Sequence, residues 1–306
     1  MTQQNFAPVV LFVYARADHT QRTLNALATN PEARETDLII YADAARHDKD
    51  VAAVQAVRDV INHVTGFKSV TLYLREKNVG LAHNIIEGVT KVSQQYGRVI
   101  VLEDDIVTSP TFLKFMNEAL DIYRENDEVL SISGCNYPVD LKDIKEDTYF
   151  LRIPLCWGWA TWADRWSLFE KKLKHVPLIS RELINELNFN GTHDFFQQAR
   201  MNYEGKLNTW FIFWYIAAVT NKKLTLFPSQ SLVSNIGFDG TGENCGESDY
   251  LYQEASNKNI EVIKRQVIES ELAFNALVIY FKSIKISLFK RLINKIKRLK
   301  KNGSPR

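Results

Sequence analysis

Two hydrophobic periods alternate along the first third of the chain. Short apolar runs rich in Val, Ile and Leu are separated by longer stretches in which apolar residues recur every three or four positions. The short runs predict strands at residues 9–14, 37–41, 69–74 and 99–102. The longer stretches predict helices at residues 20–27, 50–64 and 80–96. Strands that alternate with helices form right-handed βαβ units, so we expect an α/β fold with a parallel sheet.

The direction of these strands predicts where a ligand binds, because ligands sit beyond the carboxyl ends of parallel strands. That edge should hold residues 15–16, 42–43, 75–78 and 103–105. The last segment is Glu103-Asp104-Asp105. Three adjacent carboxylates repel one another unless a cation offsets their charge, and such oxygen ligands suit Mg²⁺ or Mn²⁺ carrying a diphosphate. A surface acidic loop or the first turn of a helix is the alternative.

The second half of the chain differs from the first in its aromatic and glycine content. All six tryptophans lie between residues 157 and 214. Most are expected in the core, although indole rings also stack on sugars. Trp157-Gly158-Trp159 is the expected exception, because glycine lets a backbone or ligand approach closely. After a predicted strand at 224–227, residues 235–246 contain four glycines, which is typical of a connector or of a lid over a site.

Composition narrows the class of protein. The chain has 306 residues, 45% apolar and 24% charged, as in ordinary globular proteins. Three cysteines without a CxxC pair indicate neither a disulfide framework nor a zinc site. The apolar stretch at residues 9–14 is too short for a secretory signal, so we expect a cytoplasmic protein. The sequence has no glycine-rich dinucleotide fingerprint and no P-loop, which disfavours a dehydrogenase or a P-loop NTPase.

The net charge is +2, but basic and acidic residues are distributed unevenly along the chain. Residues 272–306 hold ten Lys or Arg and no acid, which leaves 28 basic against 36 acidic residues in the rest of the chain. Apolar residues recur at three- and four-residue intervals in this tail, so it is predicted to form a basic amphipathic helix on an anionic membrane. It lacks the roughly 18 apolar residues that a span needs. A helix packed on its own domain is the alternative, and nucleic-acid binding is disfavoured because the body is acidic.

Several segments, in their order along the chain, resemble the nucleotide-sugar-dependent glycosyltransferases of GT-A fold. The segments that carry the likeness are Val13-Tyr-Ala-Arg16, Asp43, Arg75-Glu-Lys-Asn78-Val-Gly80, His83-Asn84, Glu103-Asp-Asp105, Trp157-Gly-Trp159, Asn208-Thr-Trp210 and residues 235–246. The sequence is most similar to bacterial sugar transferases related to the N-acetylglucosaminyltransferase I group. The likeness spans residues 8–250.

This resemblance implies a Rossmann-like, mostly parallel sheet flanked by helices. Residues 1–270 would form the GT-A domain, with a nucleotide-binding half at 1–135 and an acceptor half at 136–270. Residues 271–306 would form the amphipathic helical tail.

The resemblance also implies roles for single residues. Asp43 would accept a hydrogen bond from a pyrimidine, with a turn or helix cap as its alternative role. Arg75 would bind the diphosphate or an acidic neighbour, with a surface ion pair as its alternative. Asp105 would hold Mn²⁺ or Mg²⁺, while Asp104 and Glu103 would bond ribose or sugar hydroxyls. The further donor-binding candidates are Tyr14, Arg16, Asn78, His83 and Trp159.

The catalytic base is the least certain part of this interpretation. The resemblance implies an inverting enzyme, which needs a carboxylate to take the proton of the acceptor. In animal members that acid directly precedes a tryptophan, whereas Thr209 precedes Trp210 here. Asp194 and Asp239 are the candidates, with a helix cap and a turn as their alternative roles.

The expected function combines these inferences. The protein would move a hexose or N-acetylhexosamine from a nucleoside-diphosphate sugar, such as a UDP-sugar, to a glycan or lipid-linked acceptor. It would act on the inner face of the plasma membrane. A non-catalytic sugar-binding or scaffold protein is one alternative. A nucleotidyltransferase is another, although residues 14–20 lack the glycine-rich basic loop expected of it.

Overall fold

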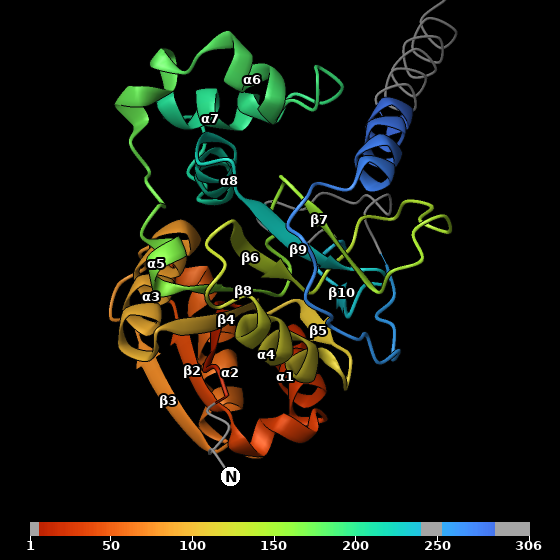
Figure 1. The fold of residues 1–306 in the computed structure, drawn as a ribbon. Helices are drawn as coiled ribbons and strands as arrows, with labels where there is room; N and C mark the ends of the chain where they lie inside the picture. The colour runs from red at the N-terminus through yellow and green to blue at the C-terminus, as the bar shows by residue number, and fades with distance from the viewer. Residues whose placement is uncertain (1–5, 240–252, 285–306) are drawn as a thin grey trace, which may run out of the picture.

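The computed structural model describes residues 6–239 and 253–284, and an eight-stranded sheet forms the centre of this part (Figure 1). The strand order is β3-β2-β1-β4-β8-β6-β9-β7. The strands are β1 (Val9–Val13), β2 (Asp37–Ala42), β3 (Ser69–Leu74), β4 (Arg98–Glu103), β6 (Val129–Ser133), β7 (Thr148–Leu151), β8 (Trp159–Trp162) and β9 (Leu224–Pro228). All run in one direction except β7 and β8, so the sheet is mostly parallel, as predicted.

Helices cover both faces of this sheet. They include α1 (Ala17–Ala28), α2 (Val51–Asn62), α3 (Leu81–Tyr96), α4 (Phe112–Ile122) and α5 (Ala163–Trp166). Farther along the chain, α6 (Arg181–Leu187) and α7 (Phe196–Tyr203) pack against α8 (Phe211–Thr220). Right-handed crossovers from β1 to β2 and from β2 to β3 place α1 and α2 on one face. The return from β3 to β4 places α3 on the other face, beside α5 (Figure 1).

A second, two-stranded sheet joins distant segments next to the acidic run. Strand β5 (Ile106–Thr108) pairs antiparallel with β10 (Val233–Asn235), and Ile106 lies opposite Asn235. The start of the glycine-rich segment therefore lies beside residues 103–105.

The structure confirms the predicted alternation of strands and helices, with ends that differ by at most three residues. The largest difference is at α1, which begins at Ala17 instead of Thr20. Thr20 resembles a helix-capping residue, but its hydroxyl donates to the carbonyl of Arg16 from inside the first turn (2.8 Å). The helix therefore starts directly after the first strand, which brings Arg16 and His19 to the edge of the sheet.

Four of the tryptophans pack together in the core. The rings of Trp159 and Trp210 stack at 5.3 Å, and those of Trp166 and Trp214 lie 5.0 Å apart. Trp159 is only 1% exposed. Trp157 is partly exposed and packs edge-on against Phe238 of the glycine-rich segment.

The described part of the C-terminal helix, residues 271–284, packs on its own domain. Ala273, Leu277 and Phe281 are buried, and the ring of Phe281 meets that of Phe189 at 5.3 Å. The predicted membrane-binding tail falls mostly on residues 285–306, which lie outside the described residues. Among the described helices, none combines the length and the apolar composition that crossing a bilayer requires.

Candidate active site

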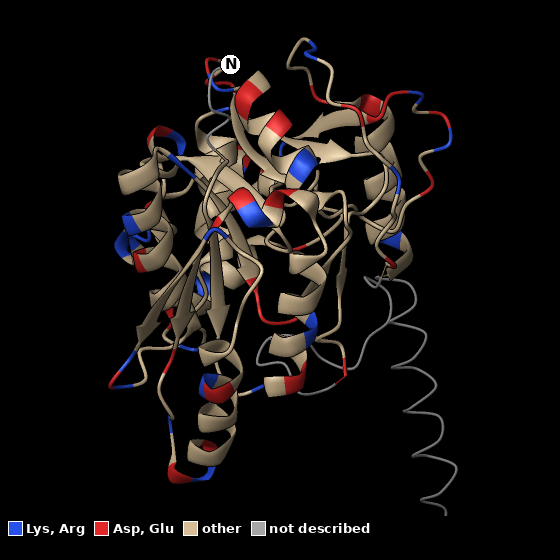
Figure 2. Ribbon diagram, turned by 90° about the horizontal axis from the view of Figure 1, so that it is seen from below, with Lys and Arg blue, Asp and Glu red and all other residues tan. Residues whose placement is uncertain are grey.

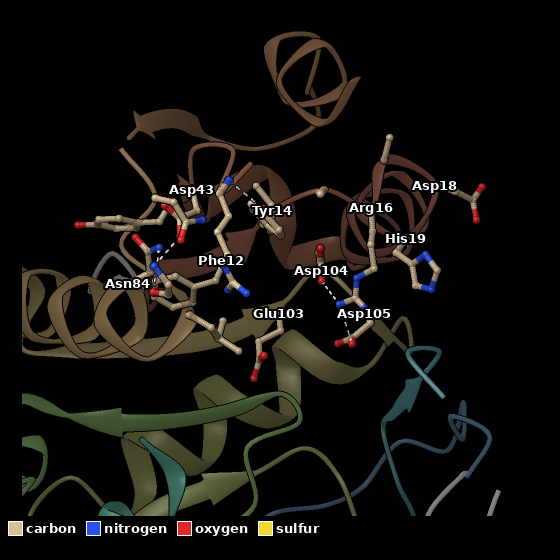
Figure 3. Close-up of a pocket in the computed structure, with 18 residues that line it drawn as sticks. Phe12, Tyr14, Arg16, Asp18, His19, Asp43, Asn84, Glu103, Asp104 and Asp105 are labelled. Carbon is tan, nitrogen blue, oxygen red and sulfur yellow. Dashed lines mark hydrogen bonds and ion pairs between the residues drawn. The ribbon is translucent and has the colours of Figure 1, made fainter. Parts of the chain in front are cut away.

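A cavity of about 490 Å³ opens at the carboxyl ends of β1, β2 and β4 (Figure 3). Ligand-binding edges of α/β sheets lie here because strand ends and helix starts converge at this edge. Most of the predicted donor-binding and metal-binding residues line the cavity, namely Tyr14, Arg16, Asp43, Asn78, Glu103, Asp104 and Asp105. The sequence therefore predicted the location of the site, while the role of each residue stays a prediction.

Arg16 and the acids after β4 form the charged end of the cavity. The guanidinium of Arg16 donates to Asp105 Oδ2 (2.8 Å) and to Asp104 Oδ1. Burial would lower the pKa of Arg16, but the charges of Asp104 and Asp105 raise it. The arginine is thus held in its charged form between the two carboxylates.

One arginine does not balance three acids. Burial, and then repulsion from Asp105 and Asp104, raises the pKa of Glu103 to about 8. Burial also raises the pKa of Asp104 to about 6, although the charge of Arg16 opposes this shift. A cluster of buried carboxylates with raised pKa values has a deficit of positive charge.

The described start of the glycine-rich segment, residues 235–239, lies against this acidic end. The backbone N–H of Ile236 donates to the carbonyl of Asp105 (2.9 Å). A Cβ on Gly237 would lie 2.2 Å from Asp105 Oδ2, so any other residue there would have to displace the Asp105 side chain. His19 Nε2 lies 3.3 Å from the carbonyl of Ile236 and 3.2 Å from Asp239 Oδ2, which ties the segment to α1.

Asp43 organises the opposite end of the cavity. Its carboxylate accepts the backbone N–H groups of Ala44 (2.9 Å), Val79 (3.0 Å) and Gly80 (2.8 Å). The amide of Asn78 donates to the carbonyl of Ala44 (2.8 Å). The end of β2 is thus joined to the turn before α3, and Asp43 holds this turn, which was one of its alternative roles. Oδ1 accepts two of these bonds and Oδ2 accepts one, so Oδ2 still has acceptor capacity for a ligand.

Arg75 and His83, two further predicted residues, lie outside the cavity lining. Arg75 binds an acidic neighbour, because its guanidinium pairs with Glu87 (2.8 Å) and donates to Asn84 Oδ1 (2.9 Å). The side chain of His83 is 61% exposed and lies 3.3 Å from Glu87 on α3. Glu87, on α3, thus contacts the side chains of both Arg75 and His83.

The two candidates for the catalytic base occupy different places. Asp194 is half exposed at the start of α7, pairs with Arg200 (2.6 Å) and accepts the backbone N–H of Gln197 (3.1 Å). It does not line the cavity. Asp239 contacts His19, which does line it. Trp159 belongs to the core and is also absent from the lining.

His19 and Asn84 were not among the predicted site residues, although both line the cavity. His19 stands three positions after Arg16. Residues three apart share a helix face, so a helix starting at Ala17 would have indicated it. Asn84 follows His83 in the quoted motif and faces the cavity one helical turn after Gly80.

The donor set of this cavity suits a hard divalent cation. The described residues do not bring three His, Cys, Asp or Glu side chains together as a metal site. A magnesium-type ion that shares a substrate diphosphate needs only one or two protein carboxylates, because phosphate and water supply the other ligands. Asp105 and Asp104 fit that requirement, and the raised pKa values at Glu103 and Asp104 indicate room for added positive charge.

The family model of glycosyl transferase family 2 matches residues 9–178, more than half of the chain. The chain belongs to glycosyl transferase family 2. It is therefore a nucleotide-sugar-dependent glycosyltransferase, and its mostly parallel sheet is of the predicted GT-A type. The matched range includes every strand and helix start that lines the cavity.

Distant similarities exist among solved structures. The mannosyltransferase PcManGT from Pyrobaculum calidifontis, in complex with GDP-Man and Mn²⁺, is 13% identical, with 71% of this chain and 70% of that chain covered and a TM-score of 0.39. A UDP-glucose pyrophosphorylase complexed with UDP-glucose is 12% identical, with 74% and 92% covered and a TM-score of 0.39. No curated protein matches the chain.

Proposed function

We propose that this glycosyltransferase moves a hexose or an N-acetylhexosamine from a UDP-sugar to a glycan or lipid-linked acceptor, with inversion and with Mn²⁺ or Mg²⁺. One observation carries the proposal. A single cavity has Arg16 and the acids of residues 103–105 at one end, and Asp43 with Asn78 at the other. All of its lining residues lie between 12 and 105, which supports residues 1–135 as the nucleotide-binding half.

The two ends of the cavity suit the two ends of the donor. Asp43 accepts a pyrimidine N–H beside the aromatic rings of Phe12 and Tyr41. At the other end, Arg16 Nη1 is buried without a hydrogen-bond partner among the described residues. This N–H is available to a diphosphate oxygen and would stabilise the charge that develops as the nucleoside diphosphate leaves. Asp105 and Asp104 would hold the divalent ion, which adds positive charge at the same leaving group.

We propose Asp239 as the residue that takes the proton of the acceptor hydroxyl. Its carboxylate lies 3.2 Å from His19 at the cavity, and the imidazole holds it in place. Asp194 is disfavoured because its carboxylate already caps α7 and pairs with Arg200 on the surface. A general base has to lie within hydrogen-bond reach of the proton it removes.

The basic sequence at residues 285–306 supports a peripheral position on the inner face of a membrane and a lipid-linked acceptor. In the described part, Lys and Arg are interspersed with Asp and Glu over the fold, so we propose no nucleic-acid partner (Figure 2). Cutting the chain after Ile284 spares the packing of Phe281. We expect this truncation to lose sedimentation with anionic vesicles while release of UDP is unchanged. Equal sedimentation of both proteins would contradict the membrane proposal.

The donor and the metal are tested together. UDP should raise the melting temperature in the presence of Mn²⁺, because a ligand that binds only the folded state stabilises it. Asp105→Asn should lose the Mn²⁺-dependent part of this shift and lower UDP release from a UDP-sugar about a hundredfold. Glu118→Gln, on α4 outside the cavity lining, is the control. Full turnover in excess chelator would contradict the metal role, and no shift with any nucleoside diphosphate would contradict the donor.

A further inference from the structure

A second pocket, of about 480 Å³, lies on the outer side of the donor cavity. Its lining comes from three separate stretches of chain, the start of α3, the segment after α5 and the segment before α8. The lining residues are Val79, Ala82, His83, Ile86, Lys171 and Asn208. In Figure 1 the chain leaves α5 beside α3 and rises toward α6.

The two pockets share one wall, formed by residues 78–86. Asn78, Gly80 and Asn84 face the donor cavity. Val79 and His83, which alternate with them, face the second pocket. A group bound in the second pocket is thus separated from the donor only by the first turns of α3. This position suits the other substrate of the reaction.

Lys171 brings an unbalanced charge into this pocket. Its side chain is partly buried, and its Nζ donates to Asn208 Oδ1 (2.5 Å) and lies 5.6 Å from the ring centre of Phe213. No carboxylate among the described residues pairs with it, whereas the neighbouring Lys172 pairs with Glu170 (2.5 Å). Burial lowers the pKa of Lys171. A bound anion would offset that penalty, because an opposite charge favours the ammonium form.

The other polar groups of the pocket also favour an anion. Lysine only donates hydrogen bonds, so the Asn208 atom that it contacts is the oxygen, and the amide NH₂ remains a donor. His83 adds a ring nitrogen at the rim. Glu87, the acid that contacts His83, also pairs with Arg75 (2.8 Å) and Lys91 (2.5 Å). The lining itself contains no Asp or Glu.

We propose that this pocket binds an anionic group of the acceptor, a carboxylate or a phosphate, through Lys171 and the amide of Asn208. Val79, Ala82 and Ile86 provide the apolar wall against which the C–H face of a sugar packs. Lys171 is then a specificity-determining residue for the acceptor. The inference rests on the proposed function, because it assigns this pocket to the second substrate.

Simple probes test the pocket directly. Glucuronic acid supplies a sugar carboxylate, glucose 1-phosphate a sugar phosphate, inorganic phosphate the anion alone and glucose the neutral sugar. Affinities are measured by isothermal titration calorimetry with and without saturating UDP. In Lys171→Met we expect the better of the two anionic sugars to bind roughly ten- to one-hundredfold more weakly, as for the loss of a charged hydrogen bond. Lys171→Arg should retain binding, and Lys174→Met is the control at an exposed lysine three positions away.

The outcomes separate the two proposals. The subsite is supported if Lys171→Met loses affinity for the anionic sugars while Lys174→Met keeps it. Tighter binding of glucuronic acid or of glucose 1-phosphate then shows whether the anion is a carboxylate or a phosphate. The subsite proposal is overturned if the anionic sugars bind wild type and Lys171→Met with equal affinity. It is also overturned if wild type binds glucose as tightly as the anionic sugars, or binds none of the probes. Binding of UDP should be the same in all variants, because Lys171 does not line the donor cavity. If the wild-type protein does not bind UDP, the proposed function is contradicted instead.

Discussion

Arg16 and Asp105 form an ion pair of 2.8 Å that joins the end of β1 to the residues after β4. Arg16 binds Asp104 as well, so one guanidinium holds two adjacent carboxylates. The side chains of Asp104 and Asp105 are 7% and 10% exposed. The geometry of the acidic end of the cavity thus depends on the residue that directly precedes α1.

Arg16→Gln should destabilise the protein, because it leaves two buried carboxylates without their cation. We expect a loss of about 3 kcal/mol in the free energy of unfolding at pH 7, measured with urea. Arg22→Gln, on α1, is the matched control, because among the described residues Arg22 makes only a long ion pair, with Asp18 (3.8 Å). It should change stability by no more than about 0.5 kcal/mol. Equal losses in both variants would show that the acids do not need Arg16.

Gly237→Ala should displace Asp105, since the new Cβ would lie 2.2 Å from Oδ2 and 3.1 Å from Arg16 Nη1. We expect a cost of about 1–3 kcal/mol from overpacking, together with weaker Mn²⁺-dependent UDP binding. Gly97→Asn is the control, because no atom lies within 4 Å of that site and asparagine tolerates its left-handed backbone. Unchanged UDP binding in Gly237→Ala would mean that the segment does not constrain Asp105.

Glu87 should make the protein sensitive to acid. Hydrogen bonds from Arg75 and then from Lys91 lower the pKa of Glu87 to about 2, from 4.5. The folded state therefore releases this proton more readily than the unfolded state. The stabilisation is fully present above pH 4.5 and is lost as the pH falls toward 2.

Glu87→Gln should thus be less stable than wild type at pH 7, and the difference should shrink as the pH falls through this window. Urea unfolding at a series of pH values measures it. Glu118→Gln, whose nearest lysine lies 3.9 Å away, should follow the wild-type curve. A constant difference between Glu87→Gln and wild type at every pH would contradict the assignment.

Asp239→Asn and Asp194→Asn compare the two candidate bases. Loss of a general base typically lowers turnover by about 10²- to 10⁴-fold. We expect that loss in sugar transfer for Asp239→Asn, whereas Asp194→Asn should only weaken the cap of α7 by about 1 kcal/mol. Affinity for UDP should be unchanged in both. A full loss of transfer in Asp194→Asn alone would reverse the assignment.

Trp159→Phe separates a core role from a donor-binding role. The indole Nε1 of Trp159 is buried and has no hydrogen-bond partner among the described residues. The substitution therefore removes packing only, and we expect a loss of about 1–3 kcal/mol in stability with no change in affinity for UDP. If Trp159→Phe binds UDP more weakly while its stability is unchanged, Trp159 has a donor-binding role.

The sequence determined the elements that build the nucleotide-binding half. Apolar residues at periods of two and of three to four predicted β1 to β4 and the helices between them, since these patterns arise from local backbone geometry. Right-handed crossovers then placed Asp43 and the acids after β4 at one edge. For this reason most of the predicted donor-binding residues line the same cavity.

Only the tertiary structure decided which residues meet across that edge. Periodicity does not say that Thr20 lies inside α1, and so it did not reveal His19. It also does not distinguish Asp239 from Asp194, because the position of Asp239 beside His19 depends on the pairing of β10 with β5. Lys171 and Asn208 come together with the start of α3 through packing between elements far apart in the chain. Contacts of this kind depend on long-range packing, whereas a sequence pattern reports the local order of the backbone.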